Sequence, residues 1–196
     1  MHDAWQATRV EVRERARRPS SVVETATEQA TLQKGAGAPR PEVLRTTVER
    51  AGRPGGKRFG ILVHAALAVV PLDADDAAIA RVTAVQGRLV GSPANEVDAA
   101  KAAVRAALQH DIFQRARASS DVRRECAIQR AVDDGTIVEG VVDLAFLDGD
   151  QWLVVDFKTD AELGERLDVY ATQLHVYTEA LTRATGGKAR AVLLSV

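Results

Sequence analysis

The chain has 196 residues, a formal net charge of −1 and 46% hydrophobic residues, which is typical of a folded globular protein and excludes bulk disorder. Its longest apolar run, Ile61–Leu72, is too short to cross a membrane and is interrupted by His64. The N-terminus lacks the apolar segment of a signal peptide, and the single cysteine, Cys126, excludes an internal disulfide. We therefore expect a cytoplasmic protein.

Charge is distributed unevenly along the chain. Residues 1–58 carry 12 basic and 7 acidic side chains, whereas residues 59–196 carry 14 basic and 20 acidic side chains. A protein that holds nucleic acid by itself usually has a basic footprint, and the second region lacks one. If this region cuts DNA, its charge favours a catalytic module with a metal-neutralised acidic site and a partner that delivers the substrate.

Residues 1–55 are expected to form an appendage that consists of a polar helix and a flexible linker. The helix is predicted at residues 4–18, and residues 19–54 are rich in Ser, Thr, Gly, Ala and Pro, as linkers are. The glycines of Gly52–Gly60 are spaced wrongly for a phosphate loop, and Arg58 stands where such a loop has Ser or Thr. This segment does not predict nucleotide binding.

Residues 56–196 are expected to form the main domain, which begins with helices at about 59–70, 74–90, 93–108 and 111–118. Asp73 and Ser92 are the expected N-caps of the second and third of these helices. His64 lies on the first helix. Because a histidine on an apolar helix is more often structural than a ligand, His64 alone carries no functional conclusion.

Strands are predicted next. The first spans residues 122–132 and contains Glu125, which suits a carboxylate cluster and a solvated strand position equally well. Residues 138–160 predict a β-hairpin with its turn at Asp148–Asp150. A helix at 161–183 and a strand at 189–196 complete the chain. Tyr170 on this last helix is as compatible with a core aromatic as with a functional residue.

The hairpin carries charged residues in apolar surroundings. Asp143 lies inside the first strand, while Asp156 and Lys158 share one face at the end of the second. Unpaired charges there would cost several kcal/mol, so pairing or metal binding is expected. Two carboxylates suit Mg²⁺, and a nearby lysine can orient water, which points to phosphodiester hydrolysis. A plain Asp156–Lys158 ion pair is the alternative, and it is the commoner meaning of a lone D-x-K.

The order of these elements resembles the PD-(D/E)XK nuclease superfamily, specifically the RecB/AddA-type nuclease domain of bacterial helicase–nucleases. Over about Gly60–Val196, the resemblance is carried by His64, Glu125, G-V-V-D at Gly140–Asp143, D-F-K-T-D at Asp156–Asp160 and Y-x-x-Q-x-x-x-Y at Tyr170–Tyr177. It implies an α/β fold with a restriction-endonuclease-like core of order αβββαβ, in which helices flank a mixed central sheet, and an additional N-terminal helical region.

The resemblance also implies roles for single residues. The residues around a Mg²⁺ ion, for which Mn²⁺ can substitute, would be His64, Glu125, Asp143, Asp156 and, through its carbonyl, Phe157. Lys158 would be the catalytic lysine, with Gln173 and Tyr177 near it and the DNA. One cysteine cannot supply the flanking iron–sulfur cluster of some relatives, and helicase motifs are absent from this sequence. The chain therefore resembles an excised domain or a stand-alone relative.

The implied function is Mg²⁺-dependent hydrolysis of DNA, with single-stranded ends delivered by a helicase during double-strand break repair and recombination. Two alternatives stay open. The first is a DNA- or protein-docking module that keeps the nuclease fold without its chemistry. The second is a stand-alone exonuclease of the CRISPR or phage type, which differs in partner rather than in reaction.

Overall fold

The computed structural model describes residues 2–17, 22–33, 37–132, 135–159 and 163–196. Its elements in chain order are α1 (His2–Arg17), β1 (Val23–Thr25), α2 (Ala26–Gln33), β2 (Glu42–Arg45), α3 (Lys57–Val69), α4 (Asp76–Val90), α5 (Ala94–Gln109), α6 (Asp111–Ala118), β3 (Val122–Ala131), β4 (Ile137–Asp148), β5 (Gln151–Lys158), a 3₁₀ turn (Leu163–Arg166), α7 (Leu167–Thr185) and β6 (Lys188–Ser195). None of the helices in these ranges is both long and apolar enough to span a membrane.

The six strands form one mixed sheet. Strands β3, β4 and β5 are consecutive antiparallel neighbours, whereas β6 lies parallel to β5 and β2 lies parallel to β6. The long strand β4 changes partner along its length, because Ile137–Glu139 pair with β1 and Leu144–Asp148 pair with β5. The expected mixed α/β, restriction-endonuclease-like fold is confirmed.

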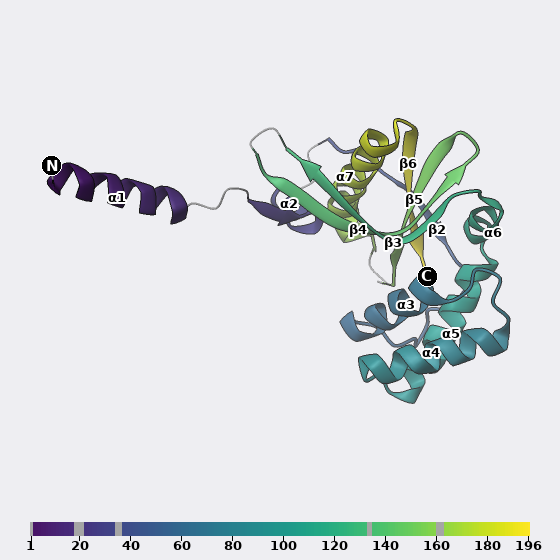
Figure 1. The fold of residues 1–196 in the computed structure, drawn as a ribbon. Coiled ribbons are helices and arrows are strands. Elements are labelled where there is room, and N and C mark those ends of the chain that lie inside the picture. Colours follow the sequence, from purple (N-terminus) through teal and green to yellow (C-terminus); the bar gives the residue numbers. More distant parts are fainter. Residues whose placement is uncertain (1, 18–21, 34–36, 133–134, 160–162) are drawn as a thin grey trace.

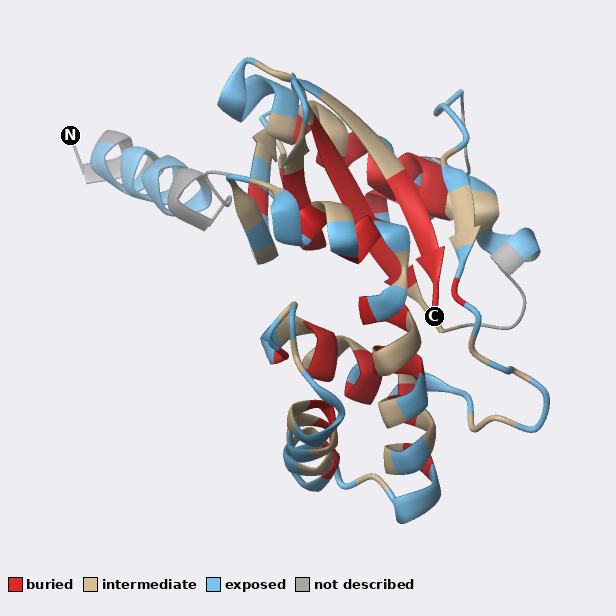
Figure 2. Ribbon diagram, turned by 90° about the vertical axis from the view of Figure 1, so that its right-hand side faces the viewer, coloured by how far each residue is buried: buried red, intermediate tan, exposed pale blue. Residues whose placement is uncertain are grey.

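Two hydrophobic cores lie on opposite faces of the sheet. Figure 1 shows α3, α4 and α5 gathered on one side of the strands, with α2 and α7 alongside the strands. Leu62 of α3 packs with Phe146 in the first core, and Leu174 of α7 packs with Val154 in the second. The strands between these cores carry long buried segments, drawn in red in Figure 2, as do the helix faces that pack on them. The sheet is thus covered on both faces by helices whose buried residues recur at helical spacing.

The helices begin close to the predicted positions, with two corrections at their caps. Asp75, rather than Asp73, caps α4, because its Oδ1 accepts a hydrogen bond of 2.7 Å from the amide of Ala78. Pro93, rather than Ser92, precedes α5 as its N-cap residue. The final helix α7 begins at Leu167; Ala161 and the next residue of the predicted helix lie outside the described residues.

The linker interpretation of residues 19–54 is wrong for three segments, since β1, α2 and β2 belong to the folded sheet and its cover. A capping box starts α2: the amide of Thr25 donates to Glu28 Oε2 (2.9 Å) and the amide of Glu28 donates to Thr25 Oγ1 (3.1 Å). Ala26 and Ala30 of α2 are fully buried. In Figure 1, α1 extends away from the sheet. A domain boundary at residue 55 stays a prediction.

Candidate active site

Strands β3 and β4 switch the face that their side chains cover at Glu125 and Asp143. Val142 packs in the core beneath α7 and Leu144 in the core beneath α3, although residues two apart on a strand normally share a face. On β3, Val122 and Cys126 differ in the same way. Glu125 itself has a φ of 49°, in the left-handed region that non-glycine residues seldom occupy. Backbone distortions of this kind concentrate at functional sites.

Asp143 links three elements. Its Oδ1 lies 3.1 Å from Nδ1 of His64 on α3, and its Oδ2 accepts a 2.7 Å hydrogen bond from the amide of Phe157 on β5. The backbone pairing of β4 with β5 ends at Leu144 and Val155, so the Asp143 carboxylate supplies the next acceptor. Asp143 is therefore buried and held between α3 and the end of β5.

Asp156 and Lys158 lie on one face of β5, as predicted. Asp156 is 4% exposed, and its Oδ2 forms an ion pair with Lys158 Nζ. Burial raises the pKa of Asp156 to about 6, although the charge of Lys158 opposes the rise; the charge of Asp143 adds to it. The local negative charge is thus only partly neutralised by the protein itself.

His64 and Glu125 belong to the same electrostatic cluster. Burial by itself would lower the pKa of His64, but the hydrogen bond and the charge of Asp143 outweigh burial, so this pKa is raised. Burial and then the charge of Asp143 raise the pKa of Glu125, against the opposing effect of His64. Asp143 and His64 therefore interact electrostatically with both of the other carboxylates, Glu125 of β3 and Asp156 of β5.

Phe157 contributes its ring as well as its backbone. The ring stacks on Phe113 of α6, with centroids 5.6 Å apart, and meets the edge of His64 at 6.0 Å. This packing fixes the end of β5 against the helices, so the backbone that carries Asp156 and Lys158 is held firmly. The role of the Phe157 carbonyl as a metal ligand stays a prediction.

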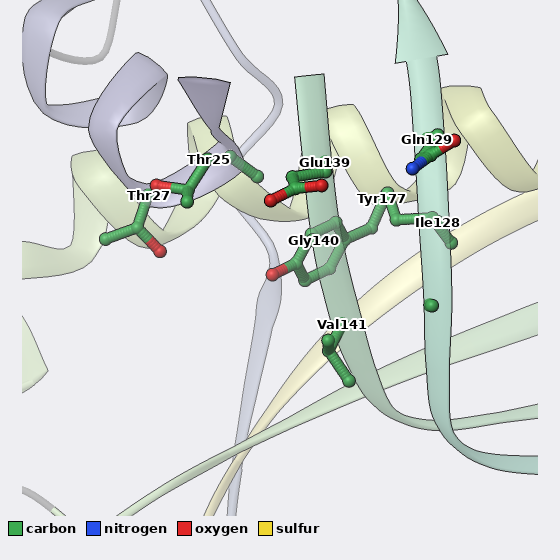
Figure 3. A pocket seen from close by; sticks show the side chains of 10 residues that line it. Thr25, Thr27, Ile128, Gln129, Glu139, Gly140, Val141 and Tyr177 are labelled. Carbon is green, nitrogen blue, oxygen red and sulfur yellow. The ribbon is translucent and has the colours of Figure 1, made fainter. Parts of the chain in front are cut away.

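Gln173 and Tyr177 form a hydrogen-bonded pair on α7, where the Gln173 Nε2 donates to the Tyr177 hydroxyl at 2.7 Å. Figure 3 shows Tyr177 beside Gly140 of β4, in a pocket of about 700 Å³ that Thr25 also lines. A Cβ at Gly140 would lie 2.6 Å from Cε1 of Tyr177, so only glycine allows this approach. Burial raises the pKa of Tyr177 to about 12, and the charges of Asp156 and Asp143 add to the rise.

Tyr170 is the site residue that the sequence left undecided. Lys158 Nζ lies 4.5 Å from the centroid of the Tyr170 ring, which is a cation–π contact. The described hydrogen bonds of Gln173 go to Thr27 and Tyr177, and none of them reaches Lys158. The sequence feature that pointed to Tyr170 was its position on the buried stripe of α7, one turn before Gln173. Histidines outside the predicted site have other contacts: His110 caps α6, and His175 lies 3.7 Å from Glu179.

The donors of this cluster fit a hard divalent cation in kind, since carboxylate oxygens are the preferred ligands of Mg²⁺. The raised pKa of Asp156 is consistent with a cation site, because burial disfavours its charge and a bound cation would restore the charged form. Within the described ranges, however, no three His, Cys, Asp or Glu side chains converge on one point. Asp143 is engaged by His64 and Phe157, and Asp156 by Lys158. Apart from its ion pair with Lys158, Asp156 Oδ2 is nevertheless buried without a hydrogen-bond partner among the described residues, so the protein leaves this carboxylate oxygen of the cluster open to a cation.

A mixed sheet covered by helices, with carboxylates from three successive strands and a lysine beside them, defines an α/β protein of the restriction-endonuclease-like class. The chain belongs to the PD-(D/E)XK nuclease superfamily, whose sequence profile matches residues 7–196. It is also 43% identical over 58 residues to an ATP-dependent helicase/nuclease subunit of Carboxydothermus hydrogenoformans. That stretch covers 28% of this chain and 5% of the length of the relative.

Proposed function

We propose that the chain is a Mg²⁺-dependent deoxyribonuclease domain that hydrolyses phosphodiester bonds in DNA. The observation that carries the proposal is the meeting of Asp143, Asp156 and Lys158 at the point where β4 and β5 separate. A buried lysine–aspartate pair is common as a structural feature. A second buried aspartate, Asp143, bonded to the amide between the two is not required by the fold, and its charge acts on Glu125 of the neighbouring strand, which supports a catalytic role.

Each residue has a proposed task. Asp143, Asp156, Glu125 and His64, with the Phe157 carbonyl, would hold the cation. When bound, Mg²⁺ supplies charge for the phosphate oxygens and lowers the pKa of a coordinated water. The ammonium of Lys158 orients the attacking water and offsets the negative charge that develops on the phosphate. The ring of Tyr170 holds this ammonium by a cation–π contact, and Tyr177, bonded to Gln173, packs α7 against Gly140 of β4.

We further propose that the substrate is a DNA end, cut exonucleolytically after a helicase delivers it during double-strand break repair and recombination. The short stretch of similarity to a helicase/nuclease protein supports this context. The excess of acidic over basic side chains in residues 59–196 also favours a partner that supplies part of the strand-holding charge.

The test is an assay of the purified chain on end-labelled single- and double-stranded DNA with Mg²⁺, Mn²⁺ or a chelator. We expect cleavage with either metal and none with the chelator. Asp156→Ala and Lys158→Ala should abolish cutting while circular dichroism and urea unfolding show a folded protein. Wild-type activity in either variant would refute the assignment.

A docking module is the second candidate, because Asp143 and Asp156 are already paired within the protein. This function would leave DNA or helicase binding intact in a wild-type chain that cuts nothing with any divalent metal. It also predicts that Asp143→Asn leaves DNA processing by a partner helicase unchanged, whereas the nuclease proposal predicts loss of that processing.

A further inference from the structure

A groove of about 620 Å³ runs along the outer face of α3 and reaches the candidate active site. Lys57 lies at the N-terminal end of this helix, Ile61 and Val69 line the groove along it, and His64 and Glu125 connect it to the carboxylate cluster. The groove and the proposed site are therefore continuous.

The part of the lining that α3 supplies is largely apolar and open to solvent, with Gln86 of α4 beside it. Ile61 is 47% exposed and Val69 is 53% exposed, and the two alanines of α3 between them also line the groove. The opposite face of α3 buries Leu62 and Val63 in the core. Because α3 is apolar on both faces, its outer face is not explained by folding, and contiguous exposed apolar surface commonly marks a binding site.

Both ends of α3 are fixed to direct neighbours of active-site residues. At its C-terminal end, the guanidinium of Arg124 donates to the carbonyl oxygens of Leu67 (3.2 Å) and Val70. Near its N-terminal end, the backbone of Gly60 lies so close to the side chain of Thr159, the residue after β5, that a Cβ would stand 3.1 Å from Oγ1 of Thr159. Arg124 precedes Glu125 and Thr159 follows Lys158, so the groove keeps a fixed position relative to the carboxylates and the lysine.

We propose that this groove seats the unpaired bases of the DNA strand next to the bond that is cut. The inference rests on the proposed nuclease function and assigns the base contacts of a single-stranded substrate to the outer face of α3. Base faces are flat and apolar and can pack on aliphatic side chains, whereas a duplex stacks its bases inside and presents a charged backbone outward. The aliphatic side chains of Ile61 and Val69 carry no charge or hydrogen-bonding group that could bind a phosphate backbone.

Charge at the end of the groove fits the same occupant. Lys57 is exposed and makes no ion pair with the described residues, while the neighbouring Arg58 is engaged by Glu96. A backbone phosphate of a strand whose bases lie along Ile61 and Val69 can thus meet the ammonium of Lys57 at one end. His64 lies on α3 between Ile61 and Val69 and lines the groove with Glu125, so a strand along these two residues passes the candidate active site.

The test separates base contacts from phosphate contacts by binding alone, with Ca²⁺ as the divalent ion. Fluorescence anisotropy would compare a labelled oligo(dT) with an abasic oligomer of equal length, for the wild type and for Ile61→Gln/Val69→Gln. We expect the double variant to lose about tenfold in affinity for oligo(dT), which corresponds to about 1.4 kcal/mol, and less than about twofold for the abasic oligomer. Val69→Gln alone should show a smaller loss of the same kind.

Leu89→Gln is the matched control, because Leu89 on α4 is 76% exposed and does not line the groove. It should bind both oligomers as the wild type does. Equal losses on both oligomers, unchanged binding of oligo(dT) by the double variant, or no oligo(dT) binding by the wild type would each overturn the inference. Unchanged DNA binding with a lost helicase contact would assign the groove to a protein partner instead. Since the readout is binding, a chain that seats bases but cuts nothing would refute only the proposed function.

Discussion

The Asp143 carboxylate accepts a hydrogen bond of 2.7 Å from the backbone amide of Phe157, at the place where β4 leaves β5. The Asp143 side chain thus takes the place of a backbone carbonyl beyond the last paired residues of β4 and β5. The same carboxylate lies 3.1 Å from Nδ1 of His64, so it couples the sheet to α3. Asp143 therefore contributes both to folding stability and to the proposed chemistry, and substitutions of Asp143 can separate the two contributions.

Asp143→Ala should destabilise the protein by about 1–3 kcal/mol, because it leaves the buried amide of Phe157 without an acceptor. Asp143→Asn keeps an acceptor oxygen and should cost clearly less, yet it should abolish cutting as completely as alanine does. Urea unfolding and the cleavage assay measure the two effects. Asp150→Ala in the exposed hairpin turn is the control, expected within about 0.5 kcal/mol of wild type. Equal stability of the Ala and Asn variants would count against this role of the side chain.

Gly140→Ala should destabilise the protein by about 1–3 kcal/mol, since its Cβ would stand 2.6 Å from the ring of Tyr177 and force α7 or β4 to move. Gly55→Ala is the control, because a Cβ there meets no atom within 4 Å. Thermal or urea unfolding compares the two variants. Adding Tyr177→Ala to Gly140→Ala should cost less than the sum of the single changes. Strict additivity would show that the close approach is not the cause.

Much of the fold follows from sequence because it depends on local patterns. The hairpin turn forms where predicted, with Asp148 paired to Gln151 and Gly149 at a φ of 67°, and α6 has the predicted bounds. Asp156 and Lys158 share a face because period-2 alternation holds throughout β5.

Other features depend on contacts between distant parts of the chain. The short strands β1 and β2 are stabilised by pairing with β4 and β6, which are distant in sequence. Their local sequence is polar and contains prolines, so it resembled a linker. The face switch at Glu125 and Asp143 reverses the alternation from which side-chain directions are inferred, and it requires a positive φ at a glutamate. The contact of Lys158 with Tyr170 depends on how α7 crosses β5.

The pKa of about 6 for Asp156 predicts how stability depends on pH in the absence of metal. Between the ordinary pKa near 3.8 and this raised value, the folded state binds more protons than the unfolded state, so the free energy of unfolding falls as pH rises from about 4 to 6. The loss should be on the order of 1–3 kcal/mol. Asp156→Asn cannot titrate, and its unfolding free energy should lack this decline. Urea titrations across that range with a chelator decide the matter, and parallel curves for the two proteins would disprove the assignment.

Asp148 predicts the opposite dependence. A hydrogen bond from Arg115, together with the nearby Arg190, lowers the pKa of Asp148, and these contacts join α6 and β6 to the hairpin. Its contribution is present above the ordinary pKa near 3.8 and is lost as pH falls through the lowered value. Asp148→Asn should cost about 1 kcal/mol or less at neutral pH, because the pair is partly exposed, and nothing in strong acid. A cost that persists unchanged in strong acid would exclude the ion pairs as its source.

Binding of Mn²⁺ tests the central claim most directly, since the claim is that acidic side chains from separate strands hold a cation beside Lys158. Isothermal titration or Mn²⁺ paramagnetic resonance should detect binding to the wild type at neutral pH, and this binding should weaken as pH falls below about 6, where Asp156 becomes protonated. The variants Asp156→Asn and Asp143→Asn should lose Mn²⁺ binding although urea unfolding shows that both are folded. The control Asp150→Asn should keep Mn²⁺ binding. Undiminished Mn²⁺ binding by the Asp156 and Asp143 variants, or none by the wild type, would contradict the account.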